Sequence, residues 1–216
     1  MPRRALRKID PAVDLAGRLR TWEDLPQPFS TAALFGRESA LEVEVGSGKG
    51  LFLASAAAAA PERDFLGLEI SRKYARFCAA RLARLGLTNA CACCADALRV
   101  FRELLPDGGL VAVHVYFPDP WWKARHKKRR VINQPFLADV ERTLQPGGVL
   151  HFWTDVEEYF QTSLDLIARH TSLEGPLEVL ASEPKDDLDY RTHFERRTRL
   201  GGQPVYRSEF RKRRLG

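Results

Sequence analysis

Residues 41–50 read Leu-Glu-Val-Glu-Val-Gly-Ser-Gly-Lys-Gly, and the helix-forming residues 51–60 follow them. The alternation of apolar and polar residues predicts a strand, and the glycines predict a tight turn that leads into a helix. Glycine has no side chain, so a ligand can approach the backbone closely at this turn. A strand, a glycine turn and a helix in this order are typical of the nucleotide-binding end of a doubly wound α/β sheet.

Strands and helices alternate along the rest of the chain. Six further strands are predicted at residues 64–70, 90–94, 110–116, 149–153, 177–180 and 205–210, and further helices at residues 71–85, 97–105, 135–144 and 156–169. Such alternation favours a mostly parallel sheet with helices on its faces. Together with the strand at residues 41–45, the predicted strands would form a seven-stranded sheet. The sequence shows no internal repeat or separate linker, so we expect a single domain over residues 39–216.

Length, charge and composition narrow the class of protein. A chain of 216 residues with 44% hydrophobic residues is long enough for one buried α/β core. Its net charge of +6 and its pI of about 9.3 favour a polyanionic partner. Residues 1–38 carry several arginines and are interrupted by Pro11, Pro26 and Pro28. They are expected to form a mobile basic arm that either touches RNA or acts as a solubilising tail.

The sequence indicates neither a membrane segment nor a metal site. The apolar residues 54–60 are far fewer than the roughly 20 that span a bilayer, so we expect a cytoplasmic protein without a membrane partner. Cys91, Cys93 and Cys94 lie in a predicted strand, where neighbouring side chains point to opposite faces. They have no nearby histidine, and we expect buried thiols and no metal.

Acidic residues near the ends of the first strands define a candidate cofactor site. Glu69 lies about 20 residues past the glycine turn, where such folds place an acid on the ribose hydroxyls of an adenosine. The turn Gly46-x-Gly48-x-Gly50 lacks the dinucleotide pattern Gly-x-Gly-x-x-Gly. Glu44 would attract a cationic donor and repel a pyrophosphate. These features favour S-adenosylmethionine over a nicotinamide dinucleotide.

Two later acids also follow predicted strands. Asp96 either faces the adenine side of the cofactor cleft, caps the helix at residues 97–105, or does both. Asp155 either caps the helix at residues 156–169 or meets a ligand at the carboxyl edge of the sheet, and the sequence does not distinguish these roles.

Residues 115–130 read Val-Tyr-Phe-Pro-Asp-Pro-Trp-Trp-Lys-Ala-Arg-His-Lys-Lys-Arg-Arg. Pro118 and Pro120 end the strand and restrict the backbone on both sides of Asp119. By itself, a basic run is usually a solvated face, and adjacent tryptophans are usually packed into a core or its rim. A restrained acid followed by tryptophans and cations favours chemistry on a base within a nucleic acid.

The block at residues 118–130 resembles the Pro-Asp-Pro-Trp-x-Lys-x-Arg-His-x-Lys-Arg-Arg signature of the tRNA (guanine-N7)-methyltransferases. Shorter matches lie at residues 44–50, 67–69, 96–97, 154–155 and 192–197. The resemblance implies a Rossmann-like class I methyltransferase with a doubly wound, mostly parallel sheet and an antiparallel C-terminal strand. It also implies S-adenosylmethionine as the cofactor and tRNA as the substrate, in a monomer or homodimer. Trp122 is a departure, because the family often has proline there.

The same resemblance implies roles for individual residues. Those implied to line the cofactor site are Glu44, Gly46, Gly48, Glu69, Asp96 and Asp119. Asp119 is also implied to be the catalytic acid. Contacts with the RNA are implied for Lys123, Asp155, Thr192 and Glu195.

The chemistry of guanine N7 agrees with these residue types. N7 has a lone pair and no proton to remove, so attack on a sulfonium methyl needs alignment more than a strong base. We expect Asp119 and Asp155 to accept hydrogen bonds from guanine N1–H and the exocyclic amine, and the cations to bind phosphates. N7 is hard to reach in a stacked helix, so the base is expected to leave its stack, with Trp121 or Trp122 as a replacement surface.

The sequence leaves alternative functions open. The chain could methylate another RNA or a protein, because the cofactor half of the fold is shared by many methyltransferases. It could also be a non-catalytic RNA-binding protein that keeps the fold. A nicotinamide-dependent oxidoreductase is disfavoured by the glycine spacing.

Overall fold

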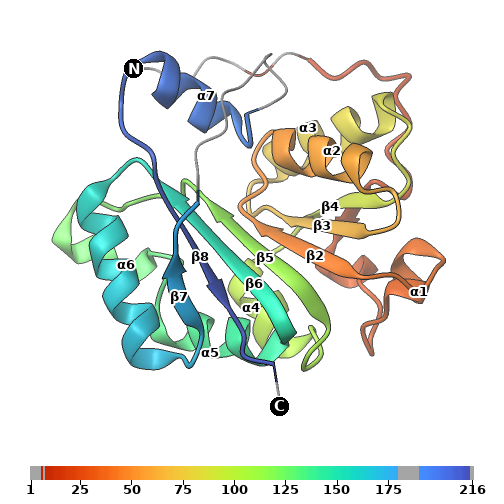
Figure 1. Cartoon of the computed structure of the whole chain (residues 1–216). Coiled ribbons are helices and arrows are strands. Elements are labelled where there is room, and N and C mark those ends of the chain that lie inside the picture. The colour runs from red at the N-terminus through yellow and green to blue at the C-terminus, as the bar shows by residue number, and fades with distance from the viewer. Residues whose placement is uncertain (1–5, 7, 180–189, 215–216) are drawn as a thin grey trace.

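The computed structural model describes residues 6, 8–179 and 190–214, and Figure 1 shows the chain. One sheet crosses the molecule, with its strands in the order β1-β4-β3-β2-β5-β6-β8-β7. The strands are β1 (Leu19–Thr21), β2 (Leu41–Val45), β3 (Asp64–Leu68), β4 (Ala90–Cys94), β5 (Leu110–Tyr116), β6 (Leu144–Thr154), β7 (Glu174–Leu177) and β8 (Tyr206–Arg211). Strands β1 to β6 pair in parallel, whereas β8 runs antiparallel to both β6 and β7. The predicted mostly parallel sheet with an antiparallel C-terminal strand is confirmed.

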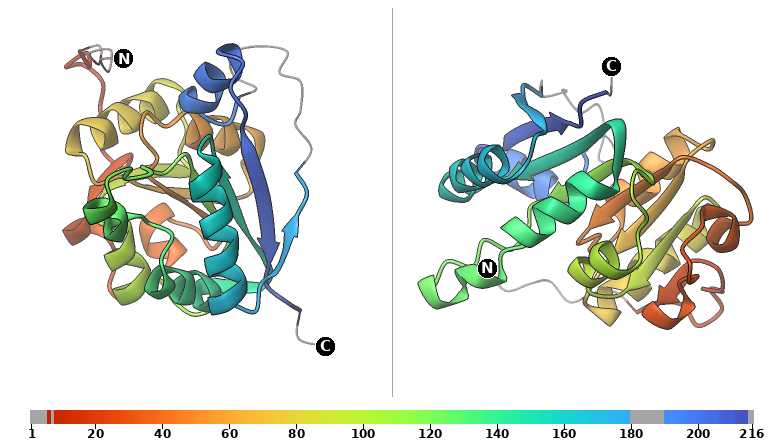
Figure 2. Two further views of the ribbon diagram at one scale, coloured as in Figure 1. Left: turned by 90° about the vertical axis from the view of Figure 1, so that its left-hand side faces the viewer. Right: turned by 90° about the horizontal axis from the view of Figure 1, so that it is seen from below.

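Helices cover both faces of this sheet (Figure 2). The helices are α1 (Thr31–Phe35), α2 (Leu51–Ala59), α3 (Arg72–Arg84), α4 (Ala97–Glu103), α5 (Gln134–Thr143), α6 (Glu157–His170) and α7 (His193–Leu200), with short 3-10 helices η1 (Trp22–Asp24) and η2 (Ala124–Arg129). Leu53 of α2 and Leu82 of α3 belong to one buried cluster with strand residues such as Phe65. The larger cluster on the other face includes Phe101 of α4 and Phe136 of α5. The two layers make this a doubly wound fold.

The sheet has eight strands, so the expectation of seven strands is wrong by one. The added strand is β1, whose Leu19 lies opposite Ala92 at the edge of β4. It comes from the segment predicted to be a mobile arm, and that prediction is also wrong for residues 19–35. Leu25 and Leu34 are only 3% and 7% exposed in the main core. A three-residue strand and a five-residue helix are too short to produce a periodic sequence signal. Residues 1–5 and 7 lie outside the described residues.

We expect Leu34→Ala to lower the free energy of unfolding by about 2–4 kcal/mol, because it deletes a buried side chain and leaves a cavity. Denaturant unfolding measures this change. Leu200→Ala is the matched control, since Leu200 is 64% exposed and its truncation should be nearly neutral. A loss as small as that of the control would mean that residues 19–35 are a mobile arm after all.

Smaller differences concern the C-terminal third of the chain. Strand β7 covers Glu174–Leu177 and not residues 177–180, and Leu180 lies outside the described residues. Helix α7 was not predicted as a helix, because its eight residues include only two large apolar side chains. Within residues 6, 8–179 and 190–214, no helix has the length and apolar character needed to cross a bilayer.

Candidate active site

The sheet topology places the reversal of strand order between β2 and β5. From β2 the chain proceeds through β3 and β4 on one side, then crosses to β5 and β6 on the other side. In open α/β sheets, ligands bind at the carboxyl ends of the strands where the strand order reverses. Here the residues just beyond those ends are the glycine turn after β2 and the Pro118-Asp119-Pro120 loop after β5.

Five acids lie along this carboxyl edge, at or just beyond the ends of consecutive parallel strands. In their spatial order, from β4 through β3, β2 and β5 to β6, they are Asp96, Glu69, Glu44, Asp119 and Asp155. Parallel strands bring residues that are far apart in the sequence to one edge of a sheet. The acids that were expected to contact the cofactor or the guanine therefore share this edge.

Glu69 holds the glycine turn in place. Its carboxylate accepts hydrogen bonds from the backbone N–H of Gly48 at 2.9 Å and from that of Ser71 at 2.8 Å. Gly46 and Gly48 adopt left-handed backbone conformations, with φ of 81° and 52°. A Cβ on Gly46 would meet no atom within 4 Å, and one on Gly48 only a backbone oxygen at 3.8 Å. These two glycines therefore border open space, as a turn that receives a ligand requires.

Gly50 has a different role from the other two glycines of the turn. A Cβ at this position would lie 2.3 Å from Sγ of Cys78 on α3, and φ is again left-handed at 67°. Gly50 therefore permits close packing of α2 against α3, and it does not face the ligand space.

Two acids on the same face of β2 have opposite environments. Glu42 accepts hydrogen bonds from Arg63 and from Nε2 of His114, both at 2.7 Å. Burial alone would raise the pKa of Glu42, but these two donors hold it at about 2. Burial lowers the pKa of His114 to about 4, so the neutral ring donates from Nε2 and accepts from the Tyr116 hydroxyl at Nδ1.

Glu44 is the unsatisfied member of this pair. It is only 3% exposed, and its Oε2 atom is buried without a hydrogen-bond partner among the described residues. Burial first, and then the charge of Glu69, raise the pKa of Glu44 well above its usual range. A buried carboxylate oxygen with no partner suits a cationic ligand such as the sulfonium donor.

The loop that carries Asp119 is fixed at both ends. Phe117 and Trp121 have left-handed φ values of 49° and 45°, which bulky residues rarely adopt. Before the loop, the Phe117 N–H donates to the Trp153 carbonyl at 2.8 Å, and after it Nε of Arg130 donates to the Pro120 carbonyl at 2.8 Å. Unusual backbone held by surrounding contacts is common at functional sites. The backbone that carries Asp119 is therefore restrained at the carboxyl edge of the sheet.

The basic run divides into structural and exposed cations. Arg130 is buried and pairs with Glu158 of α6 at 2.7 Å, and Lys127 pairs with the same carboxylate at 2.8 Å. These hydrogen bonds, first from Arg130 and then from Lys127, lower the pKa of Glu158 to about 2. Lys123, Arg125 and Lys128 are exposed and make no ion pair within the described part of the chain. Sequence reasoning assigned all six cations to the RNA, and it missed the anchoring role of Arg130.

We expect Glu158→Gln to lower the turnover number of methylation about tenfold while leaving donor affinity unchanged, because the Asp119 loop loses its anchor. The depressed pKa means that the ion pairs stabilise the fold above pH 4.5 and that this stability is lost as the pH falls through about 2. Glu158 is half exposed, so the variant should lose less than about 1 kcal/mol of the free energy of unfolding. Single-turnover kinetics measure the expected loss in the rate of methyl transfer. Glu103→Gln, which breaks an exposed pair with Arg99, is the control.

The two acids with alternative roles are now distinguished. Asp96 caps α4, because its Oδ1 accepts from the Leu98 N–H at 2.9 Å. Asp155 does not cap α6: the N-cap position is Val156, whose N–H donates at 3.2 Å to the Thr154 hydroxyl. The capping expectation for Asp155 is therefore wrong, and Asp155 lies just beyond β6 at the carboxyl edge of the sheet.

Helix α7 lies near the carboxyl ends of β5 and β6 (Figure 1), where the ring of Phe194 packs tilted against that of Phe117, with 5.2 Å between the ring centroids. Thr192 is its N-cap and accepts from the Glu195 N–H at 2.9 Å. Glu195 is 3% exposed and accepts from the Arg191 N–H and from Arg207. Thr192 and Glu195 thus hold the helix together, while Phe194 is its exposed aromatic side chain, at 39%.

The two tryptophans also differ. Trp121 lies edge-on to His126 at 5.7 Å and under the guanidinium of Arg129 at 5.1 Å. Trp122 is 68% exposed. Only Trp122 therefore offers an open flat surface next to the Asp119 loop. Among the described residues, no group of three or more His, Cys, Asp or Glu side chains is placed to hold a metal ion.

Comparison with known proteins gives the class of protein first. A family model described as a putative methyltransferase matches residues 38–208. The antibiotic-resistance methyltransferase Kmr aligns with a TM-score of 0.54 at 20% identity, over 82% of this chain and 88% of that chain. The aminoglycoside resistance methyltransferase NpmB1 aligns with a TM-score of 0.53 at 18% identity, over 80% and 87%. The fold and the site define a Rossmann-like class I methyltransferase, a class that uses S-adenosylmethionine.

Relatives in sequence are more specific. The tRNA (guanine-N(7)-)-methyltransferase of Rhodopirellula baltica is 49% identical over 99% of this chain and 81% of its own length. The enzymes with the same name from Dechloromonas aromatica and Yersinia enterocolitica are 40% and 35% identical, over 88% and 94% of this chain and 76% and 91% of their own lengths. The chain belongs to the tRNA (guanine-N7)-methyltransferase family, which confirms the resemblance of residues 118–130.

Proposed function

We propose that the protein transfers the methyl group of S-adenosylmethionine to N7 of a guanine in tRNA, giving 7-methylguanosine, and that it works in the cytoplasm. The observation that carries this proposal is the row of carboxylates along the carboxyl edge, with Asp119 in a fixed loop at the crossing between β2 and β5. Family membership supports the substrate, because the relatives are named for this reaction.

The residues of the glycine turn are those that would hold the donor. When bound, S-adenosylmethionine supplies an electrophilic methyl group on a sulfonium. Gly46 and Gly48 leave room for it, and Glu69 has lone pairs left for ribose hydroxyls after accepting from Gly48 and Ser71. Glu44 supplies a negative charge for a cationic ligand, and Asp96 lies toward the adenine side.

Asp119 and Asp155 are proposed to orient the guanine. Both follow adjacent strands, β5 and β6, at the carboxyl edge. Their carboxylates would accept hydrogen bonds from N1–H and the exocyclic amine, and would stabilise the positive charge that the ring gains on methylation. No proton leaves N7 at this step, so alignment and charge are the contributions these residues make.

The exposed cations are proposed to bind the RNA backbone. Lys123 lies two residues beyond Trp121 and makes no ion pair within the described residues, so it is available to a phosphate. Trp122 would stack on a base that has left the RNA helix. Thr192 and Glu195 would act on the RNA indirectly, by presenting the exposed part of α7.

Nucleoside analysis tests the proposal. Unmodified tRNA is incubated with the purified protein and S-adenosylmethionine labelled in the methyl group, then digested to nucleosides. The expected result is labelled 7-methylguanosine. Label in another nucleoside, or in ribosomal RNA or protein alone, would support a methyltransferase with another substrate. No transfer, together with no donor binding by calorimetry, would support a non-catalytic protein.

A further inference from the structure

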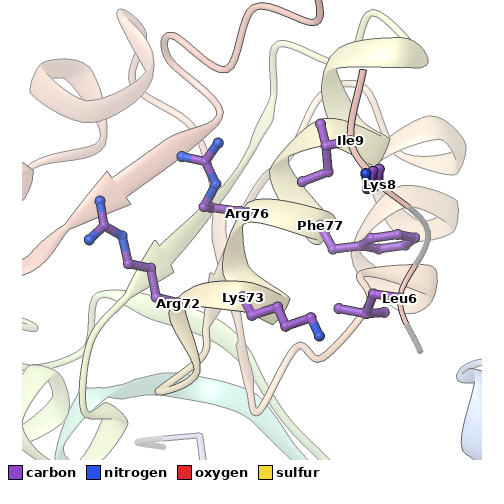
Figure 3. A pocket seen from close by; sticks show the side chains of 7 residues that line it. All are labelled: Leu6, Lys8, Ile9, Arg72, Lys73, Arg76 and Phe77. Carbon is purple, nitrogen blue, oxygen red and sulfur yellow. The ribbon is translucent and has the colours of Figure 1, made fainter. Parts of the chain in front are cut away.

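An open groove lies between the N-terminal residues and α3, separate from the residues assigned to the active site. It has a volume of about 600 Å³, and its lining includes the cationic side chains of Lys8, Arg72, Lys73 and Arg76 together with the apolar Leu6 and Phe77. In Figure 3 the guanidiniums of Arg72 and Arg76 extend to one side of α3, while Lys73 and Phe77 extend toward Leu6. We call this surface the α3 groove.

The cations of the α3 groove are not neutralised by ion pairs within the described residues. Lys8, Arg72, Lys73 and Arg76 are exposed, and none forms an ion pair with any residue in the described ranges. Elsewhere on the surface, the exposed Arg99 does have a partner, since it pairs with Glu103 at 3.0 Å. Four unneutralised cations that line one groove repel one another, and a polyanion would relieve this repulsion.

The arrangement of α3 fixes the direction of these side chains. Ala75, Cys78, Ala79 and Leu82 are buried against the sheet, so the opposite face of the helix, which carries the basic residues, must point outward. The cations therefore belong to a rigid, packed helix and not to a loop. The backbone that carries these side chains is therefore already ordered before a ligand binds, and only the rotamer freedom of the side chains themselves is lost on binding.

The groove is also close in sequence and space to the cofactor site. Helix α3 begins three residues after Glu69, whose carboxylate accepts from Gly48 of the glycine turn. Its first turn therefore lies at the same carboxyl edge as the proposed base site, but beyond β3 on the donor side and not at the ends of β5 and β6. An RNA that places one base in that site extends beyond it, and its backbone can reach the first turn of α3.

We propose that the α3 groove binds the phosphodiester backbone of the tRNA away from the modified base, with Phe77 and Leu6 packing against a sugar or base. The proposal rests on the proposed function. A phosphate strand is the occupant that fits, since the groove is cationic and open. Residues of the groove supply affinity and position, and none of them touches the reacting atoms.

The test is a charge-matched comparison in the full-length protein. The groove variant carries Lys73→Gln and Arg76→Gln. The control carries Arg84→Gln and Arg169→Gln, which remove two exposed charges from helix ends outside the groove. For each protein, tRNA affinity is measured from about 50 to 200 mM salt, donor affinity by calorimetry, and methylation by nucleoside analysis.

The groove variant is expected to lose about tenfold in tRNA affinity at low salt. The slope of log K against the logarithm of the salt concentration should become shallower by about 1.4–1.8, because two phosphate contacts are lost. Its KM for tRNA should rise. Its turnover number at saturating tRNA and its affinity for the donor should be unchanged. Equal tRNA affinities and slopes in the groove variant and the control would overturn the proposal. So would a groove variant that keeps tRNA binding but loses binding to anionic phosphatidylglycerol vesicles, because the occupant would then be a membrane surface. Failure of the wild type to form 7-methylguanosine would instead refute the proposed function.

Discussion

We expect Asp119→Asn to lower the kcat/KM of tRNA methylation by about 10²–10³-fold. The change keeps the size of the side chain and removes the charge that would oppose the positive charge developing on the guanine ring. It also replaces one acceptor oxygen by a donor, which would face the N1–H or the amine donor of the base. Most of the loss should appear in kcat, since the interaction strengthens as the methyl group arrives.

The loop geometry makes this test informative. Asp119 lies between Phe117 and Trp121 with their left-handed backbones, and the loop is anchored through the Pro120 carbonyl to Arg130. An isosteric change at Asp119 should therefore leave the loop in place and the melting temperature unchanged. Asp107→Asn, an exposed acid that pairs with Arg142, controls for a general effect of charge. A normal methylation rate in Asp119→Asn would rule out the electrostatic role.

The local sequence was sufficient to predict that Asp119 lies at the end of a strand. It did not show all the contacts that restrain the loop around it. The flanking prolines predict a strand end and a stiff acid, because proline acts on its own backbone and on the preceding residue. The anchor through Arg130 and Glu158 joins residues 28 positions apart, and no local pattern reports it. For the same reason the basic run was assigned wholly to RNA, although Lys127 and Arg130 are paired within the protein.

The same distinction applies to the fold. Strands β2 to β5 were predicted because apolar residues and glycine or proline breaks define them within a few positions. Strand β1 and helix α1 were missed because their stability comes from contacts with distant elements, such as the pairing of Leu19 with Ala92. Glu195 was expected to touch the RNA, and only the structure shows that it lies buried against Arg207. The motif singled out the segment without showing which way each side chain points.

Glu44→Gln is expected to have opposite effects on donor binding and on stability. In the unliganded protein, burial and the neighbouring Glu69 raise the pKa of Glu44, which means that its ionised form is unfavourable in the fold. A group with a raised pKa contributes stability below its unfolded pKa and loses it as the pH rises. Glutamine resembles the protonated acid, so at pH 7 the variant should be more stable by about 1 kcal/mol or more. Its affinity for S-adenosylmethionine should fall roughly tenfold to a hundredfold, because the cation loses its counter-charge.

The pH dependence of donor binding gives this prediction a second readout. Since the raised pKa keeps the carboxyl protonated in the free protein at low pH, a cation that binds beside it must displace the proton. Wild-type affinity should therefore rise with pH up to the free-state pKa and then level off. Calorimetry in buffers of different ionisation enthalpy should detect proton release, and the Gln variant should show none.

Glu42→Gln is the matched control, because Glu42 lies on the same face of β2 but is satisfied by Arg63 and His114. The pKa of Glu42 is lowered to about 2, so its ion pair with Arg63 and its hydrogen bond from His114 stabilise the fold above pH 4.5, and this stability is lost as the pH falls through about 2. Its amide should therefore destabilise the protein at pH 7 and leave donor affinity unchanged. If Glu44→Gln instead behaves like Glu42→Gln, losing stability and keeping both donor affinity and proton release, then Glu44 is a structural acid and the donor's charge is balanced elsewhere.

If Glu44→Gln does lose donor affinity, comparing S-adenosylmethionine with the neutral-sulfur S-adenosylhomocysteine shows whether Glu44 acts on the sulfonium or on the amino acid group. A loss confined to S-adenosylmethionine places Glu44 near the sulfonium, and an equal loss for both places it near the shared amino acid group.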